Sequence, residues 1–132
     1  MTSPDPQYPE AVAAALAVMD AHIEGLNARD QAAIAATLHF PHMRLSGTEL
    51  KVWETEESYF SDFLLRAGDD WDHSKFDDIQ LLRASESKVH LDAEIQRFNS
   101  SGEMITNFRS LWVITFEDGR WAAKMRSSFA KT

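Results

Sequence analysis

At 132 residues, with 44% hydrophobic side chains and eight Phe, the chain has the length and apolar content of a single globular domain. Its formal net charge of −8 argues against a nucleic-acid partner, which requires a basic face, and the absence of cysteine excludes disulfides and thiolate metal sites. The N-terminal segment lacks the features of a secretory signal, and no apolar stretch approaches the about 20 residues that span a membrane, so we expect a cytoplasmic protein without a membrane partner.

The spacing of apolar residues predicts a helix near the start of the chain. Residues 1–9 contain three prolines and are expected to form a flexible arm in front of one domain over residues 10–132. From Pro9 to Asn27, apolar side chains recur every three or four residues, which predicts an amphipathic helix. Asn27 is expected to end this helix in a left-handed conformation.

A break in the helical pattern follows. Asp30 is expected to cap a second helix, which ends near Leu38 because Pro41 lacks a backbone donor and restricts the residue before it. Two short strands, about residues 42–46 and 50–53, are then expected to pair as a hairpin.

The second half of the chain has the pattern of a sheet. A third helix is predicted over residues 55–67, with Tyr59 on its buried side. Beyond it, turn signals at residues 85–86, 99–102 and 118–119 divide the chain into four long strands. The expected fold class is therefore α+β, with three N-terminal helices packed on a long curved antiparallel sheet.

The last predicted turn determines which side chains share a face of the sheet. A two-residue loop at Asp118-Gly119 places Trp112 opposite Met125 and Ser110 opposite Ser127. These pairs are expected on the core face, and a one-residue slip would move every side chain to the other face.

The preceding turn gives a compatible result. A four-residue loop over residues 99–102 places Arg97 opposite Met104, on the same core face. Arg126 is assigned to the opposite, outer face. The first long strand, about residues 76–84, has a poor alternation that a bulge would correct.

The order of these elements resembles the nuclear-transport-factor-2-like superfamily, which includes SnoaL-like polyketide cyclases and ketosteroid isomerases. The resemblance covers about residues 10–130 and rests most on residues 25–30 (GLNARD), 117–121 (EDGRW) and 125–129 (MRSSF). It implies a cystatin-like cone, in which helices close one side of a curved sheet and leave a conical cavity. It also implies homodimerisation through the outer sheet face, but a fold alone assigns no activity.

The isomerase mechanism of that superfamily does not transfer to this chain. Those enzymes use an aspartate base soon after the second helix, with a tyrosine and a second acid as oxyanion donors. The matching stretches here, residues 38–44 and 110–113, contain no acid, and the apolar stripe of the first helix has no tyrosine.

Histidines are the candidate catalytic residues, because imidazole titrates near neutral pH. His39 and His42 flank Phe40-Pro41 at the expected mouth of the cavity, and His22 lies on the apolar stripe of the first helix. Each has an ordinary alternative. His39 and His42 would then bond to free backbone carbonyls, and His22 would be a satisfied core residue.

Arg97 is the candidate for charge recognition. A guanidinium on the core face requires a carboxylate, a helix C-terminus or an anionic ligand, unless it reaches solvent at the strand end. Ser110 and Ser127 would either orient a ligand or satisfy each other. Since small-molecule pockets are largely apolar, the aromatic candidates for the lining are Trp53, Tyr59 and Trp112.

We expect neither a metal nor a cofactor. The possible ligands are His22, His39, His42 and His73, with Asp69, Asp70 and Asp72 near the last, but their spacing matches no recognised ligand pattern. The aspartates are more simply explained as a solvated loop.

Two functions stay open. The first is a small-molecule-binding pocket domain for a mostly apolar compound, either as a binding protein or as a lyase, isomerase or hydrolase. The second is a non-catalytic homodimeric module whose cavity is filled by its own side chains. A cavity of at least about 300 Å³ would favour the first, and a collapsed interior the second. In either case the dimer is expected through the outer face, where Leu111 and Val113 lie among charged residues.

Overall fold

The computed structural model describes residues 7–130 and has the predicted α+β class, with three helices and one six-stranded sheet in that part of the chain. The helices are α1 (Pro9–Ala28), α2 (Gln31–Ala35) and α3 (Glu56–Ala67). The strands are β1 (Leu38–Ser46), β2 (Glu49–Trp53), β3 (His73–Ala84), β4 (Lys88–Phe98), β5 (Met104–Glu117) and β6 (Arg120–Ser128). Most of the expected N-terminal arm lies outside the described residues, and the single domain over residues 10–132 stays a prediction.

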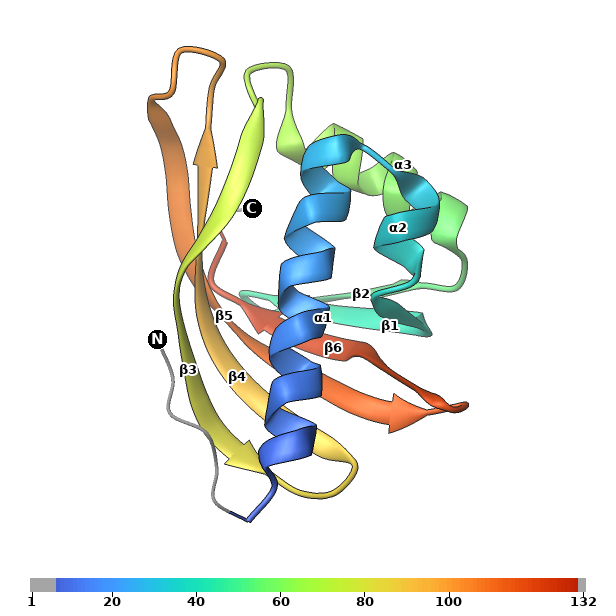
Figure 1. Ribbon diagram of the computed structural model, residues 1–132. Coiled ribbons are helices and arrows are strands. Elements are labelled where there is room, and N and C mark those ends of the chain that lie inside the picture. Colours follow the sequence, from blue (N-terminus) through green and yellow to red (C-terminus); the bar gives the residue numbers. More distant parts are fainter. Residues whose placement is uncertain (1–6, 131–132) are drawn as a thin grey trace.

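The sheet is strongly curved, and the helices lie on its concave side. Its strand order is β2-β1-β6-β5-β4-β3, with β1 parallel to β6 and the other neighbours antiparallel. Figure 1 shows α1 crossing the concave face, with α2 and α3 together near one end of it. Among residues 7–130, no helix is both long and apolar enough to cross a membrane.

The first helix ends one residue later than predicted, and its left-handed residue lies two residues later. Arg29, not Asn27, takes the left-handed conformation (φ 53°), and its N–H donates to carbonyls of the last turn. Asn27 instead ties α1 to β3, because its side-chain amide donates to the Ser74 carbonyl (2.8 Å) and accepts from the Ser74 N–H (2.7 Å). Asp30 caps α2 as expected, but this helix ends at Ala35 and β1 already begins at Leu38.

The strand β1 is therefore longer than the predicted segment from residue 42. It pairs with β6 from Leu38 to Ser46, with a register shift between Leu38 and Met43. The irregular stretch contains Pro41, which has no N–H to donate to a neighbouring strand.

The hairpin between β4 and β5 has the predicted faces but a different register. The connection spans residues 99–103, and Ile105 is an extra residue in β5, so Arg97 pairs with Thr106 and not with Met104. The shift amounts to two residues along most of the ladder. Because side chains alternate with a period of two, Arg97 keeps its predicted face.

The hairpin between β5 and β6 departs from prediction in a way that changes the interior. Its Asp118-Gly119 turn is as predicted, with φ values of 53° and 75°. Ile114 pairs with Ala123, but Val113 pairs with Met125, so Lys124 is an extra, bulged residue.

The Lys124 bulge reverses the faces of the residues that follow it. Trp112 pairs with Arg126 and Ser110 pairs with Ser128. The placement of Ser127 on the core face was therefore wrong, as was the placement of Arg126 on the outer face. Arg126 is 7% exposed and lies in the interior.

Bulges also correct the first long strand, as its poor alternation required. The register of β3 against β4 shifts between Phe76 and Asp78 and again between Leu81 and Arg83. After the first shift Ile79 and Leu81 pack against the core. The expected bulge is therefore confirmed.

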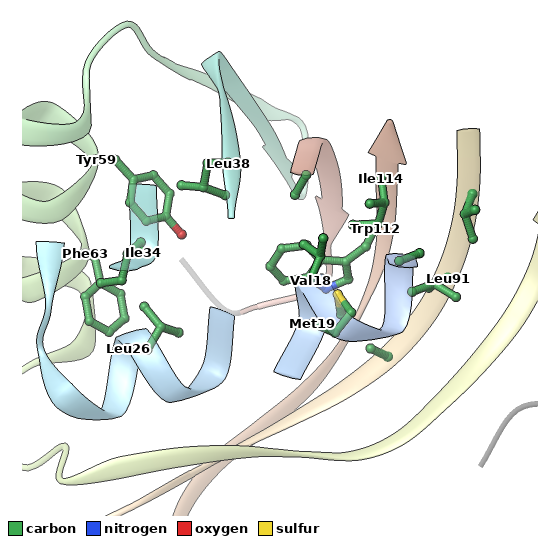
Figure 2. Close-up of a cluster of buried hydrophobic side chains, with 14 of the residues drawn as sticks. Val18, Met19, Leu26, Ile34, Leu38, Tyr59, Phe63, Leu91, Trp112 and Ile114 are labelled. Carbon is green, nitrogen blue, oxygen red and sulfur yellow. The ribbon is translucent and has the colours of Figure 1, made fainter. Parts of the chain in front are cut away.

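The core fills the space between α1, α3 and the concave face of the sheet. Figure 2 shows Tyr59 and Phe63 on the α3 side, with Trp112 and Leu91 on the sheet side. The indole of Trp112 contacts His22 and Phe76 edge to face, at centroid distances of 5.1 and 5.9 Å.

Replacing Trp112 with Ala is expected to lower the free energy of unfolding by about 3–5 kcal/mol, because a large buried ring leaves a cavity behind. Urea melts of both proteins measure the loss. Phe129→Ala is the control, since that ring is 79% exposed and its removal should change stability by no more than about 0.5 kcal/mol. A loss below about 1 kcal/mol for Trp112→Ala would contradict its place in the core.

Candidate ligand-binding pocket

A small pocket lies between the concave face of the sheet, α1 and α3. Its free volume is about 20 Å³, which suits one compact group rather than a whole drug-sized molecule. The side chains that line it come from α1, α3 and the central strands: His22, Leu26, Arg44, Tyr59, Phe63, Arg66, Ile95, Arg97, Phe108, Ser110, Trp112 and Arg126.

The lining has a large excess of positive charge. Among residues 7–130 it includes four arginines and no Asp or Glu, and we refer to Arg44, Arg66, Arg97 and Arg126 as the arginine cluster. Arg44 on β1 lies directly opposite Arg126 on β6. Like charges at directly opposed positions repel, so this pair needs a compensating negative charge.

The carboxylate beside the cluster lies at its edge. Asp62 accepts a hydrogen bond from Arg66 Nε (2.7 Å) and also lies 3.7 Å from Lys51 Nζ. Asp62 is thus shared between two cations and does not line the pocket. The charges of Arg44, Arg97 and Arg126 are left without a partner carboxylate in the described part of the chain.

Burial and mutual repulsion both act on the cluster. Burial, followed by the charges of Arg126 and Arg66, lowers the pKa of Arg44 to about 10. Burial and the same two neighbours lower the pKa of Arg97 to about 10. Both side chains stay protonated at neutral pH, so the pocket is cationic under ordinary conditions.

The phenol of Tyr59 is fully buried beside these cations. The ring centroid lies 5.8 Å from the guanidinium carbon of Arg66 and 5.6 Å from that of Arg126. Burial alone would raise the pKa of the Tyr59 hydroxyl, but Arg126 and Arg66 outweigh it and lower that pKa. Figure 2 shows the phenol oxygen pointing into the interior, toward the Trp112 side.

His22 lines the pocket, and one of its ring nitrogens has no hydrogen-bond partner among residues 7–130. Its Nδ1 lies 2.8 Å from Thr37 Oγ1, whereas its Nε2 is buried and has no partner among residues 7–130. Burial, followed by the charges of Arg126 and Arg66, lowers the pKa of His22 to about 3. The ring is therefore neutral at physiological pH.

His39 and His42 lie outside the pocket lining and bond to backbone carbonyls, which is the ordinary alternative stated for them. His39 Nε2 lies 3.0 Å from the Thr115 carbonyl, and His42 Nδ1 lies 3.0 Å from the Ala123 carbonyl. Burial, then the charge of Arg126, lowers the pKa of His42 well below its usual value.

The structure brings together part of the predicted site. His22, Tyr59, Arg97, Ser110 and Trp112 line the pocket, whereas Ser127 lies on the outer face because of the Lys124 bulge. Trp53 contacts Tyr59, at a ring-centroid distance of 5.0 Å, but does not line the pocket. That these residues bind a ligand stays a prediction.

Three members of the arginine cluster were absent from the predicted site. Arg44 could have been found, because it alternates with His42 and Ser46 along a strand and so shares their face. Arg66 lies three residues after Phe63 and thus on the buried side of α3. Arg126 could not have been found, because the Lys124 bulge has no signature in the sequence.

A metal could be held only by a cluster of suitable ligands. Among residues 7–130, no group of three or more His, Asp or Glu side chains is arranged to hold one. The cationic lining favours anionic ligands.

Stability is expected to fall in mild acid because His22 is buried in its neutral form. In the unfolded chain His22 takes up a proton as the pH falls through 6.5. In the folded chain its pKa is about 3, so the ring stays neutral until the pH is much lower. This stability is present above pH 6.5 and is lost as the pH falls toward 3, by up to about 1.4 kcal/mol per pH unit. His42 acts in the same direction.

The test is the free energy of unfolding between pH 7.5 and about pH 4.5, measured for wild type and His22→Leu. The variant should lose less stability over this interval. Met19→Leu, a nearby buried change without a titrating group, should keep the wild-type slope. Equal slopes in wild type and His22→Leu would show that His22 does not resist protonation.

Comparison with known proteins supports the fold and nothing finer. No protein-family model matches the chain, and no curated protein matches it in sequence. Among solved structures, an NTF-2-like protein of unknown function from Shewanella oneidensis has a TM-score of 0.73 at 13% identity, over 90% of this chain and 98% of that one.

Two further structures are similar over most of both chains. A protein of unknown function with a cystatin-like fold from Nostoc punctiforme has a TM-score of 0.73 at 9% identity, over 91% of this chain and 90% of that one. A ketosteroid isomerase-like protein from Erwinia carotovora atroseptica has a TM-score of 0.66 at 15% identity, over 95% and 99%. The chain therefore has the nuclear-transport-factor-2-like fold that its sequence resembles.

Proposed function

We propose that this domain binds a small organic acid, whose carboxylate or a comparable oxyanion occupies the pocket beside the arginine cluster. The observation that carries the proposal is the convergence of Arg44, Arg97 and Arg126 on one buried space that no carboxylate of the described chain lines. Guanidinium groups match carboxylates and phosphates with two-point hydrogen bonds. An anion would supply the charge that the pocket lacks.

Orphaned donors support the same proposal. Arg66 Nη2 and Arg97 Nε are buried and have no acceptor among residues 7–130. An unmet buried donor costs about 1–3 kcal/mol, and more when it is charged. A bound carboxylate presents two oxygens and can accept from both.

The size of the pocket limits which part of the ligand is enclosed. About 20 Å³ is somewhat more than one water requires, so the pocket encloses only a compact polar group of the ligand. The ligand body would extend along the apolar part of the lining, toward the half-buried Phe108. A mostly apolar ligand is expected from the sequence. In the proposed function this ligand also carries an anionic group at one end.

The second function, a module filled by its own side chains, is favoured by the small free volume. The charge of the lining supports the first function instead. Burying like charges together destabilises a fold, and an apolar filling of the same volume would be more stable. A ligand that neutralises the cluster would offset this cost, whereas packing alone would not.

Replacing Arg97 with Met is expected to separate binding from stability. The variant keeps the apolar stem and removes one uncompensated charge, so its ligand-free form should be more stable by about 1 kcal/mol. Phenylacetate should raise the melting temperature of wild type, and the neutral phenylacetamide should not. The effect of the acid should disappear in Arg97→Met.

Arg109→Met is the matched control for this thermal-shift experiment. Arg109 lies on the outer face and pairs with Asp92 (3.1 Å), Asp78 (3.3 Å) and Glu94 (3.7 Å). Its loss should lower stability and leave the acid effect intact. Equal acid-induced shifts in wild type and Arg97→Met would leave Arg97 without a binding role.

We also propose that the chain forms a homodimer through the outer face of the sheet. An apolar band crosses this face on four neighbouring strands, where Met43 pairs with Val52 and Met125, and Met125 pairs with Val113. Val52 is 47% exposed, and the adjacent Leu50 is 58% exposed. A continuous exposed apolar surface of this kind is typical of protein interfaces.

Val113→Glu should convert the dimer to a monomer, because it places a charge within the apolar band, at its β5 end. Sedimentation at micromolar concentration measures the change. Leu65→Glu is the control, since Leu65 is 82% exposed on α3, away from the sheet. A wild-type protein that sediments as a monomer would rule out this interface.

A further inference from the structure

We infer that the acid bound by the pocket also carries a hydroxyl group, and that His22 Nε2 accepts the hydrogen bond from it. This inference rests on the proposed binding of an acid and specifies its chemical class. It places two different recognition elements in one pocket, the arginine cluster for the anionic group and His22 for the hydroxyl.

The hydrogen bonds around Thr37 determine which nitrogen of His22 carries the proton. Thr37 Oγ1 donates its hydrogen to the Ile34 carbonyl at 2.7 Å. It therefore has only lone pairs to offer His22 Nδ1, which lies 2.8 Å away. Nδ1 must be the donor, so the neutral ring carries its proton there and leaves Nε2 as an acceptor.

The acceptor at Nε2 has a fixed position and no partner. His22 is 1% exposed, and its ring is held edge to face against Trp112 at 5.1 Å. Nε2 has no hydrogen-bond donor among residues 7–130, although His22 lines a pocket rich in guanidinium donors. A ligand atom that contacts Nε2 must therefore bring its own hydrogen.

The unmet atoms of the lining are complementary to a hydroxy acid. Arg66 Nη2 and Arg97 Nε are donors that need acceptors, and a carboxylate supplies them. His22 Nε2 is an acceptor that needs a donor. An ammonium group could also donate, but the positive charge of the arginine cluster repels it, whereas a hydroxyl is neutral. A hydroxyl can in addition accept from Ser110, another residue of the lining.

The test compares acids that differ only in the hydroxyl. Calorimetric titration of wild type with mandelate and phenylacetate should show the hydroxy acid binding about threefold to tenfold more tightly, the usual value of one hydrogen bond. The pair 3-hydroxybutyrate and butyrate tests a hydroxyl one carbon farther from the carboxylate. Phenylglycine, with an ammonium in place of the hydroxyl, should bind more weakly than phenylacetate.

Two variants connect the preference to His22. His22→Phe keeps the ring and removes the acceptor, so the hydroxy acid and its parent should bind equally while acid binding persists. Thr37→Val removes the group that holds the proton on Nδ1, and it should also reduce the preference without changing the pocket charge. Folding of both variants is checked by circular dichroism.

Nitrogen-15 NMR measures the protonation state of the His22 ring directly, alongside the titrations. Nitrogen-15 spectra of His22 should show Nδ1 protonated and Nε2 unprotonated at neutral pH, with the Nε2 resonance shifting on addition of the hydroxy acid. If wild type binds both members of each pair equally, or if Nε2 carries the proton, the inference is overturned while the proposed acid binding stands. If neither member of either pair binds, the proposed acid binding fails together with the inference.

Discussion

Like charges held side by side are the constraint on which the interior of this protein depends. Arg44 and Arg126 occupy opposed positions on the parallel strands β1 and β6, on the buried face of the sheet. Arg126 reaches that face only because Lys124 is bulged out of the ladder with β5. In a regular ladder its side chain would point outward, and the pocket would lose the cation that lies over both Trp112 (4.9 Å) and Tyr59 (5.6 Å).

On the outer face of the sheet, an arginine with a structural role is surrounded by carboxylates. Arg109 is surrounded by Asp78, Asp92 and Glu94, all within 3.7 Å. The chain has 21 acidic residues, so carboxylates are not scarce. Their absence from the described pocket lining is consistent with a site that destabilises the empty protein and is completed by a ligand, as binding sites often are.

Local signals were sufficient to predict much of the fold. Asp30 caps its helix through a side-chain hydrogen bond, and Asp118-Gly119 forms the two-residue turn, because each of these structures depends on a few neighbouring residues. Arg97 was placed on the correct face although its register was wrong by two residues, since an even shift preserves the faces.

The candidate site was less predictable because it depends on odd shifts. One extra residue at Lys124 exchanges the faces of Arg126 and Ser127, and its neighbours contain neither Gly nor Pro to mark it. The partners of His22 were equally hidden, because Thr37 lies fifteen residues away in the chain and meets it only after α2 turns back on α1. Long-range contacts of this kind require the folded structure.

We propose that the arginine cluster is a preformed site for an anion. The most direct measurement follows the Nε–H resonances of the arginine side chains by nitrogen-15 NMR while mandelate is added. Saturable shifts are expected for Arg97 and Arg126, with Arg109 unchanged because its carboxylate partners already satisfy it. Resonances of Arg97 and Arg126 that stay in place, or that drift in proportion to acid concentration without saturating, would contradict it.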